Sequence, residues 1–141
     1  MRKSGNRDKA VVYPQLVTVA VINQIDKVLL IQRAREPASG KWALPSGADG
    51  FRKFSDPAEA VKEEVRIDLG ADFSVDYFLK YYYSELDGEP VVILAYSGKI
   101  AGQPVLNPEA ALECRYFSEE EIAALDLAFE HKKIIQDFFY Q

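Results

Sequence analysis

The sequence predicts an α+β protein in which a mixed β-sheet is covered by helices. Segments rich in β-branched and aromatic residues come first, and one well-capped helix, further strands and C-terminal helices follow them. Strands and helices do not alternate regularly, as they would in a doubly wound parallel sheet. The chain has 141 residues, a length that fits one domain.

Composition and charge narrow the class of protein. A hydrophobic content of 48% is sufficient for a packed core. The formal net charge of −5 argues against a protein dedicated to binding nucleic acid, although a nucleotide substrate stays possible. The single cysteine, Cys114, excludes an intrachain disulfide and a cysteine-rich zinc site. With no apolar segment long enough to span a membrane, we expect a soluble, cytoplasmic protein.

The N-terminal part predicts a tail and a hairpin. Residues 1–12 are mostly polar and basic, so we expect a flexible tail before a single domain at 13–141; an arm that touches a partner is the alternative. Residues 16–22 and 27–33 are rich in aliphatic side chains and are separated by a short polar turn. Two such strands predict a β-hairpin.

A helix over residues 57–69 is predicted by the signals at its ends. Asp56 can cap the first turn, Pro57 suits the first helical position, and Glu59 at the third completes an arrangement like a capping box. Gly70 is a typical residue at a helix C-terminus. Before this helix, residues 42–45 are short and extended, and a Pro-Ser-Gly turn follows them.

The C-terminal half predicts three strands and two helices. The strands are expected at residues 73–86, 91–96 and 112–117, with a turn at Asp87-Gly88. Ser118 and Glu121 form a capping box for a short helix, and residues 129–140 have the apolar spacing of an amphipathic helix.

The helix at 57–69 carries two carboxylates where apolar side chains are expected. At about 100° per residue, Glu64 and Asp68 fall within the apolar face, which is formed by Ala60, Val61, Val65 and Ile67. A carboxylate directed at a core is costly unless it is paired, hydrogen-bonded or bound to a metal, and two of them one turn apart repel each other. A divalent cation resolves both problems. The alternative is that both reach the rim of the core or pair with a basic side chain such as Arg33.

This stretch resembles the Nudix box of the Nudix hydrolase family, which includes MutT-like and ADP-ribose pyrophosphatase-like proteins. The family pattern is Gly, five residues, Glu, seven residues, then Arg-Glu-U-x-Glu-Glu-x-Gly-U, where U is a bulky aliphatic residue. The matching residues are Gly47, Glu64, Val65, Asp68 and Gly70. The flanking segments KVLLIQRA, GKWALPSG, LECRYFSEEEI and LAFEHKKIIQDFF also resemble the family, so the resemblance covers residues 13–140. It implies the Nudix fold, an α/β/α sandwich.

Four positions depart from the family pattern. The first glutamate of the pattern falls at Ser55, its arginine at Glu63, the first of its paired glutamates at Ile67, and the closing aliphatic residue at Ala71. The segment from Gly47 to Ser55 is also two residues longer than in the family. A shifted register that pairs Glu63 with Glu64 discards the helix start and stop, and Glu64 is a candidate ligand in both registers.

The resemblance implies a chemistry and a set of residues. We expect hydrolysis of a phosphoanhydride bond in a nucleoside diphosphate linked to another moiety, with weak or altered activity. Mg²⁺ or Mn²⁺ would be held by Glu64 and Asp68, the expected catalytic residues, with the Gly47 carbonyl. The expected phosphate contacts are Arg33, Arg52 and Lys53, and Glu109 or Glu113 is a candidate acid from a later loop.

Other functions stay open at this stage. The missing acids favour a Nudix-fold module that binds a nucleotide or a protein without cleaving it, and the resemblance makes a homodimer plausible. A surface made by the tyrosines at 81–83 is a third possibility, although strand alternation places Tyr82 on one face and its two neighbours on the other. His131, the only histidine, is expected to be an ordinary hydrogen-bonded helix residue, and Trp42 to pack beneath the loop.

Overall fold

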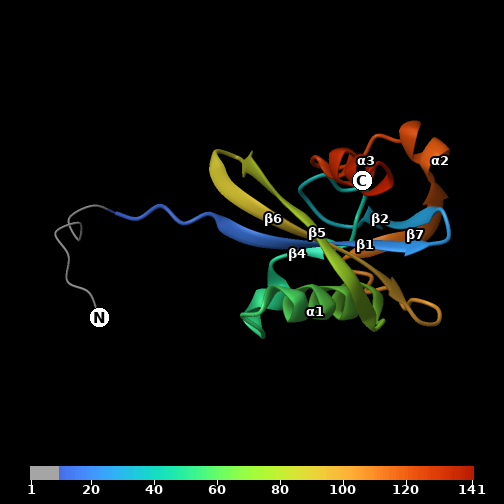
Figure 1. Ribbon diagram of the computed structural model, residues 1–141, viewed down its shortest axis with the longest axis horizontal. Helices are drawn as coiled ribbons and strands as arrows, with labels where there is room; N and C mark the ends of the chain where they lie inside the picture. Colours follow the sequence, from blue (N-terminus) through green and yellow to red (C-terminus); the bar gives the residue numbers. More distant parts are fainter. Residues whose placement is uncertain (1–9) are drawn as a thin grey trace.

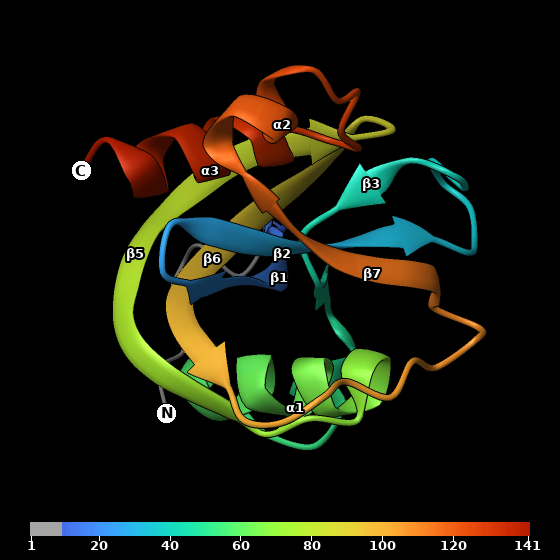
Figure 2. The same ribbon diagram turned by 90° about the vertical axis from the view of Figure 1, so that its right-hand side faces the viewer.

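The computed structural model describes residues 10–141; residues 1–9, and with them most of the predicted tail, lie outside the described residues. Within the described range, a seven-stranded mixed sheet lies between α1 on one side and α2 and α3 on the other (Figures 1 and 2). The strands are β1 (Gln15–Gln24), β2 (Lys27–Arg33), β3 (Trp42–Ala43), β4 (Ser46–Gly47), β5 (Phe73–Leu86), β6 (Glu89–Ile100) and β7 (Ala111–Ser118). The helices are η2 (Asp49–Arg52, 3₁₀), α1 (Pro57–Leu69), α2 (Glu119–Ala123) and α3 (His131–Phe139). The predicted sandwich is confirmed.

Strand β1 is the centre of the sheet. It pairs antiparallel with β2, confirming the predicted hairpin, and parallel with β6 over its first eight residues, Gln15 to Ile22. The short strand β4 pairs antiparallel with Thr18 and Val19 of β1. Because β4 leads directly into the loop before α1, this pairing fixes the loop against the middle of the sheet.

Alternating residues of β1 divide the core between the two faces of the sheet. Val19 and Val21 pack with Ile134 and Ile135 of α3, whereas Ala20 and Ile22 pack with α1. The residues of α1 in this second cluster are Val61, Val65 and Leu69. Each side chain on this sheet therefore faces one helix layer or the other, as the two-residue period of a strand requires.

The ends of α1 agree with the sequence. The Asp56 side chain accepts a hydrogen bond from the Ala58 N–H at 3.0 Å, and Gly70 ends the helix in the left-handed conformation at φ 58°. Glu59 forms an ion pair with Lys62 at 3.3 Å rather than completing the expected capping box. The capping box of α2, between Ser118 and Glu121, is confirmed.

Strands β1, β6 and β7 are longer than predicted, and α3 is shorter. β6 runs to Ile100 because its ladder with β5 continues until Ile100 pairs with Phe73. α3 begins at His131 and not at residue 129, because Phe129 has a φ of 55° and cannot continue a right-handed helix.

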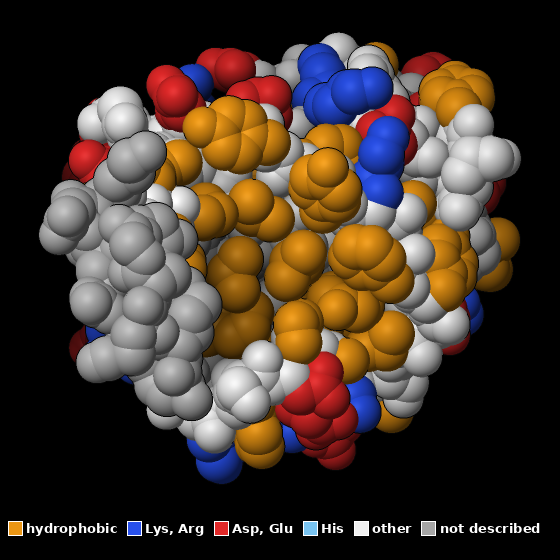
Figure 3. All heavy atoms as spheres, turned by 60° about the vertical axis from the view of Figure 1, so that its left-hand side comes forward, with side chains coloured by type: hydrophobic (Ala, Val, Ile, Leu, Met, Phe, Trp, Pro, Cys, Tyr) orange, Lys and Arg blue, Asp and Glu red, His pale blue; other side chains and the backbone are white. Residues whose placement is uncertain are grey.

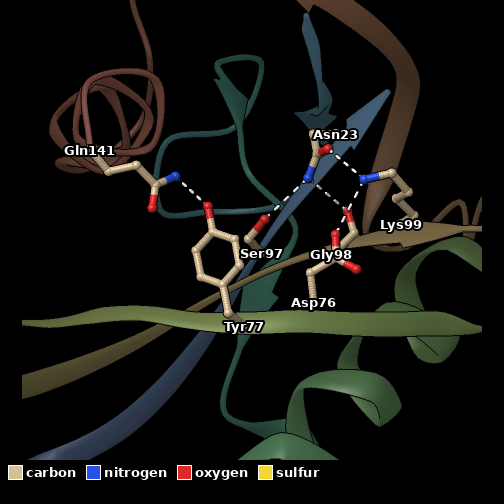
Figure 4. Close-up of polar contacts among 7 residues, drawn as sticks. All are labelled: Asn23, Asp76, Tyr77, Ser97, Gly98, Lys99 and Gln141. Atoms are coloured by element: carbon tan, nitrogen blue, oxygen red, sulfur yellow. Dashed lines mark hydrogen bonds and ion pairs between the residues drawn. The ribbon is translucent and has the colours of Figure 1, made fainter. Parts of the chain in front are cut away.

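A group of polar contacts ties β1, β5 and β6 together (Figure 4). The Asn23 amide donates to Ser97 Oγ and to the Gly98 carbonyl, both at 3.1 Å. Lys99 Nζ donates to Asn23 Oδ1 at 2.9 Å and to Asp76 Oδ2 at 3.2 Å. These bonds hold the C-terminal end of β1 in register with β6.

No helix among residues 10–141 is long and apolar enough to cross a membrane.

Candidate functional site

Helix α1 buries the two carboxylates that the sequence places on its apolar face. Glu64 and Asp68 are each 1% exposed. Glu64 Oε1 accepts a hydrogen bond from the Gly50 N–H at 3.2 Å. Among the described residues, Glu64 Oε2 and Asp68 Oδ1 are buried without a hydrogen-bond partner. Ile67, which was predicted to belong to this face, is only partly buried, and Leu69 takes its place.

The predicted alternative, a pairing with Arg33, is not what the structure shows. Arg33 Nε donates to the Pro37 carbonyl at 2.8 Å, and its guanidinium lies 4.9 Å from the centre of the Phe129 ring. Within residues 10–141, no Lys or Arg lies within ion-pair distance of Glu64 or Asp68. Two acids in the core without a cationic partner are costly, which makes this pair the main candidate site.

Burial perturbs the titration of both acids. It raises the pKa of Glu64, and burial followed by the charge of Glu64 raises the pKa of Asp68 to about 7. The positive charge of Arg35 opposes both shifts. A carboxyl group with a pKa shifted towards neutrality is a common feature of functional sites.

Gly47 lies in direct contact with the Glu64 carboxylate. A Cβ atom at position 47 would be 2.6 Å from Glu64 Oε2, which is too close for any side chain. Gly50, whose N–H binds Glu64, is equally tight, since a Cβ there would collide with the Ala60 carbonyl. The glycines therefore let the β4–η2 segment lie directly on α1, and η2 lies in the loop between β4 and α1.

A cavity of about 330 Å³ is lined in part by Gly47. Apolar lining residues come from strands β1 and β6, and the arginines, acids and aromatic rings come from β2, β5, the loops and the start of α3. The lining residues include Val17, Val19, Arg33, Arg35, Gly47, Ser84, Glu85, Val91, Ile93, Phe129, Glu130 and His131. This volume is within the range of small-molecule sites.

The structure brings some of the predicted site residues together and separates others. Arg33 and Gly47 line the cavity, and Glu64 lies directly behind Gly47. Arg52 and Lys53 do not line it; they pair with Asp49 at 3.2 Å and with Glu63 at 4.0 Å. Their contact with phosphates stays a prediction.

The candidate acids of the later loop also lie outside the cavity. Glu109 and Glu113 are both exposed and are not among the residues that line it. Glu113 lies 3.9 Å from Arg115. A role for either one as an acid stays a prediction.

The positions that depart from the family pattern supply no further ligands. Ser55 is exposed, Ile67 is apolar, and Glu63 forms ion pairs with Arg66 and Lys53. No group of three acidic, histidine or cysteine side chains able to hold a metal occurs within residues 10–141. The two buried carboxylates suit one cation with oxygen ligands, and their neighbours do not extend the set to several ions.

Sequence reasoning missed two cavity residues. Arg35 also lines the cavity, two residues beyond Arg33. The two-residue period of an extended segment was the signal that could have identified it, because residues two apart can face the same side. His131 accepts a hydrogen bond at Nδ1 from the Leu44 N–H at 3.0 Å, a contact across 87 residues that no local pattern indicates. Trp42 packs against Phe117 at 4.9 Å between ring centres and does not line the cavity.

The fold and the β4–α1 segment define a Nudix domain, and comparison with known proteins agrees. The family model for the NUDIX domain matches residues 12–138, and the chain therefore belongs to the Nudix family. The predicted family and fold are confirmed.

Individual relatives point in the same direction. The chain is 29% identical over 130 residues to an ADP-ribose pyrophosphatase of Methanocaldococcus jannaschii, covering 89% of this chain and 73% of that protein. A MutT NUDIX hydrolase from Burkholderia pseudomallei has a TM-score of 0.77 and 24% identity, with 89% of this chain and 98% of that chain covered. The NUDIX domain of Shewanella oneidensis NrtR, solved in complex with ADP ribose, has a TM-score of 0.78 and 18% identity, with 99% and 98% covered.

Proposed function

We propose that the protein is a pyrophosphohydrolase that cleaves a phosphoanhydride bond in a nucleoside diphosphate linked to another moiety, with ADP-ribose as the first compound to test. The observation that carries this proposal is the pair of buried acids, Glu64 and Asp68, each with one oxygen that no described group satisfies. Glu64 also contacts Gly47, which lines the cavity. The similarity to an ADP-ribose pyrophosphatase supports the choice of compound.

Glu64 and Asp68, with the Gly47 carbonyl, would hold one Mg²⁺ or Mn²⁺. The fit rests on the donor set, because hard divalent cations prefer oxygen ligands and the two free carboxylate oxygens are buried on one helix face. When bound, such an ion neutralises charge on a diphosphate and lowers the pKa of a coordinated water.

The residues of the chain itself bind and orient the substrate. Arg33 and Arg35 are the cationic residues of the cavity wall, and in this proposal they bind phosphate oxygens. The apolar residues of β1 and β6 would accept the base or sugar. Activity is expected to be weak or altered, because Glu63 puts a negative charge, paired with Arg66, where the family has an arginine.

The test is phosphate release from a panel of nucleoside diphosphate derivatives in the presence of Mg²⁺ or Mn²⁺. We expect Glu64→Gln to reduce turnover by about a hundredfold or more, because it removes the charge of a metal ligand. Glu63→Gln, a matched change of the neighbouring glutamate outside the buried pair, is the control. Equal turnover by the wild type and Glu64→Gln would overturn the assignment.

A second candidate function is binding without cleavage. The departures at Ser55, Glu63 and Ile67 favour it, since each lacks the group that the family pattern has. Calorimetry separates the two functions. Saturable binding of ADP-ribose that yields no product with either metal supports a binding module.

We also propose that two copies associate through an apolar face of the sheet. This face, here called the tyrosine face, consists of Leu16, Phe78, Tyr81, Tyr83, Val92 and Leu94. Leu16 and Tyr83 both pair with Val92, and Tyr81 pairs with Leu94, so these side chains share one side of the sheet. Among residues 10–141 the strand order ends at β5, so the outer edge of β5 has no strand partner in the described part of the chain. Figure 3 shows hydrophobic side chains gathered over this part of the molecule.

A second copy of the chain is the partner that suits the tyrosine face. The rows of this face, Leu16–Val92–Tyr83 and Thr18–Leu94–Tyr81, contain no charged side chain, and homodimer interfaces are more apolar than transient ones. An exposed apolar sheet face beside an open edge strand is a feature that monomers normally avoid.

We also propose that the protein is located in the cytoplasm. The support for this is its single cysteine, because proteins of a reducing compartment rarely contain disulfides.

A further inference from the structure

His131 is a buried histidine in the wall of the cavity. It is the first residue of α3, it is 2% exposed, and it is the only histidine of the chain. The residues that line the cavity include it together with Phe129 and Glu130, which precede the helix. The proposed hydrolysis assigns no task to it.

One hydrogen bond fixes the tautomer of the His131 ring. The Leu44 N–H donates to Nδ1 at 3.0 Å, so Nδ1 carries no proton and the neutral ring has its proton on Nε2. Burial, with a smaller contribution from Arg33, lowers the pKa of His131 to about 3, and the ring is therefore neutral near pH 7. Within residues 10–141, no group accepts a hydrogen bond from Nε2–H.

The neighbours of His131 form a recognition wall. The Phe129 ring lies 5.4 Å from the imidazole between ring centres, and the Arg33 guanidinium lies over the same phenyl ring. The same cavity is also lined by the apolar side chains of Val17, Val19, Val91 and Ile93. Arg33, Phe129 and His131 therefore lie next to one another in the wall, as a cation, an aromatic ring and a neutral hydrogen-bond donor.

We propose that His131 is a specificity-determining residue whose Nε2–H donates a hydrogen bond to an acceptor atom of the ligand's nucleobase. The proposal rests on the proposed function, in which the cavity takes a nucleotide. A phosphate is the better match for the cationic Arg33 and Arg35, whereas a neutral donor in a cavity that an aromatic ring and aliphatic side chains also line suits a flat, uncharged base. A buried donor also rejects ligands that leave it without an acceptor.

Two substitutions separate the two nitrogens of His131. In His131→Asn, the shorter amide can accept from the Leu44 N–H in place of Nδ1 but does not reach the Nε2 position. In His131→Gln, the longer amide reaches the Nε2 position as a donor and gives up the Nδ1 contact. We expect His131→Asn to keep the melting temperature and to lose about tenfold in ADP-ribose affinity, and His131→Gln to show a lower melting temperature with affinity largely retained.

If His131 has only a structural role, its bond to Leu44 is what matters and its Nε2–H does not contact the ligand. His131→Asn, which keeps the bond to Leu44, would then bind ADP-ribose as tightly as the wild type does. Equal affinities of His131→Asn and the wild type in calorimetry would overturn the proposal. Leu112→Lys, on the exposed side of β7 and outside the cavity, is the control for unspecific effects on binding.

Nitrogen NMR of the histidine ring provides a readout without catalysis. Because the chain has one histidine, its two ring nitrogens give an unambiguous pair of signals. We expect the Nε2–H tautomer in the free protein, and a shift of Nε2 and its proton on addition of ADP-ribose with little change at Nδ1. Saturable binding that leaves Nε2 unmoved overturns the role of His131 alone. A wild type that binds no nucleotide of the panel overturns the proposed function, and the role of His131 with it.

Discussion

Asp68 links the candidate site to the pH dependence of stability. Burial and the charge of Glu64 raise the pKa of Asp68 from its ordinary value of 3.8 to about 7. Between these two values the unfolded chain has lost the proton and the folded protein still binds it. The free energy of unfolding therefore decreases as pH rises through this window, by an amount on the order of 2–4 kcal/mol from this group. The raised pKa of Glu64 acts in the same direction.

We expect Asp68→Asn to remove most of this pH dependence. Without divalent metal, the wild type should be less stable at pH 7.5 than at pH 5, and the variant should show a smaller difference in urea unfolding. Mn²⁺ should stabilise the wild type at pH 7.5, because a bound cation favours both ionised carboxylates, and should have little effect on the variant. A wild type and variant with the same pH profile would contradict the assigned burial of Asp68.

At the scale of single residues, the sequence was informative where helical spacing alone decides. Glu64 and Asp68 are one turn apart, and the 100° rotation per residue placed both on the buried face. His131 could not be identified in this way, because its partner Leu44 lies 87 residues away. Ile67 was predicted to lie on the buried face but is only partly buried. The face of α1 that packs against the sheet is formed by Val61, Val65 and Leu69.

At the scale of elements, the contact between β4 and α1 determines the geometry of the site. Gly47→Ala would put a methyl group 2.6 Å from Glu64 Oε2, so the carboxylate or the strand must move. We expect Gly47→Ala to lower the free energy of unfolding by about 1–3 kcal/mol and to weaken Mn²⁺ binding. Urea unfolding and a Mn²⁺ titration measure these two effects.

The double variant Gly47→Ala/Glu64→Ala is the matched control for this contact. Removal of the Glu64 carboxylate removes the atoms with which the new methyl group collides, so the cost of Gly47→Ala should be clearly smaller in that background. Equal costs in the two backgrounds would show that the close approach to Glu64 does not explain the glycine.

Local signals set the ends of some elements, and pairing set the ends of others. Asp56 and Gly70 lie at the ends of α1, where capping chemistry is readable from the sequence. The length of β6 depends on its partner β5, which pairs with it as far as Ile100. The start of α3 depends on the backbone of Phe129, whose positive φ is not typical of a phenylalanine.

At the scale of the whole molecule, the family resemblance predicted the sandwich but not the cavity. The cavity wall combines β1, β6, the loop after β2 and the start of α3, which are distant in the sequence. The tyrosine face was predicted only in part. Alternation correctly separated Tyr82, which donates to Asp137 of α3 at 2.8 Å, from its exposed neighbours, but could not show that Leu16 and Leu94 continue the same surface.

The tyrosine face leads to a prediction about assembly. Two protonated lysines on this face would have to be buried in an interface between two copies, which is costly. We therefore expect the double variant Tyr81→Lys/Tyr83→Lys to shift the protein from dimer to monomer in sedimentation velocity, with melting temperatures compared at low concentration. Leu112→Lys is the matched control, because Leu112 is 60% exposed, close to the 63% of Tyr81, but lies on β7. A wild type that sediments as a monomer at high concentration would contradict the proposed dimer, and a control variant that dissociates equally would move the interface away from the tyrosine face.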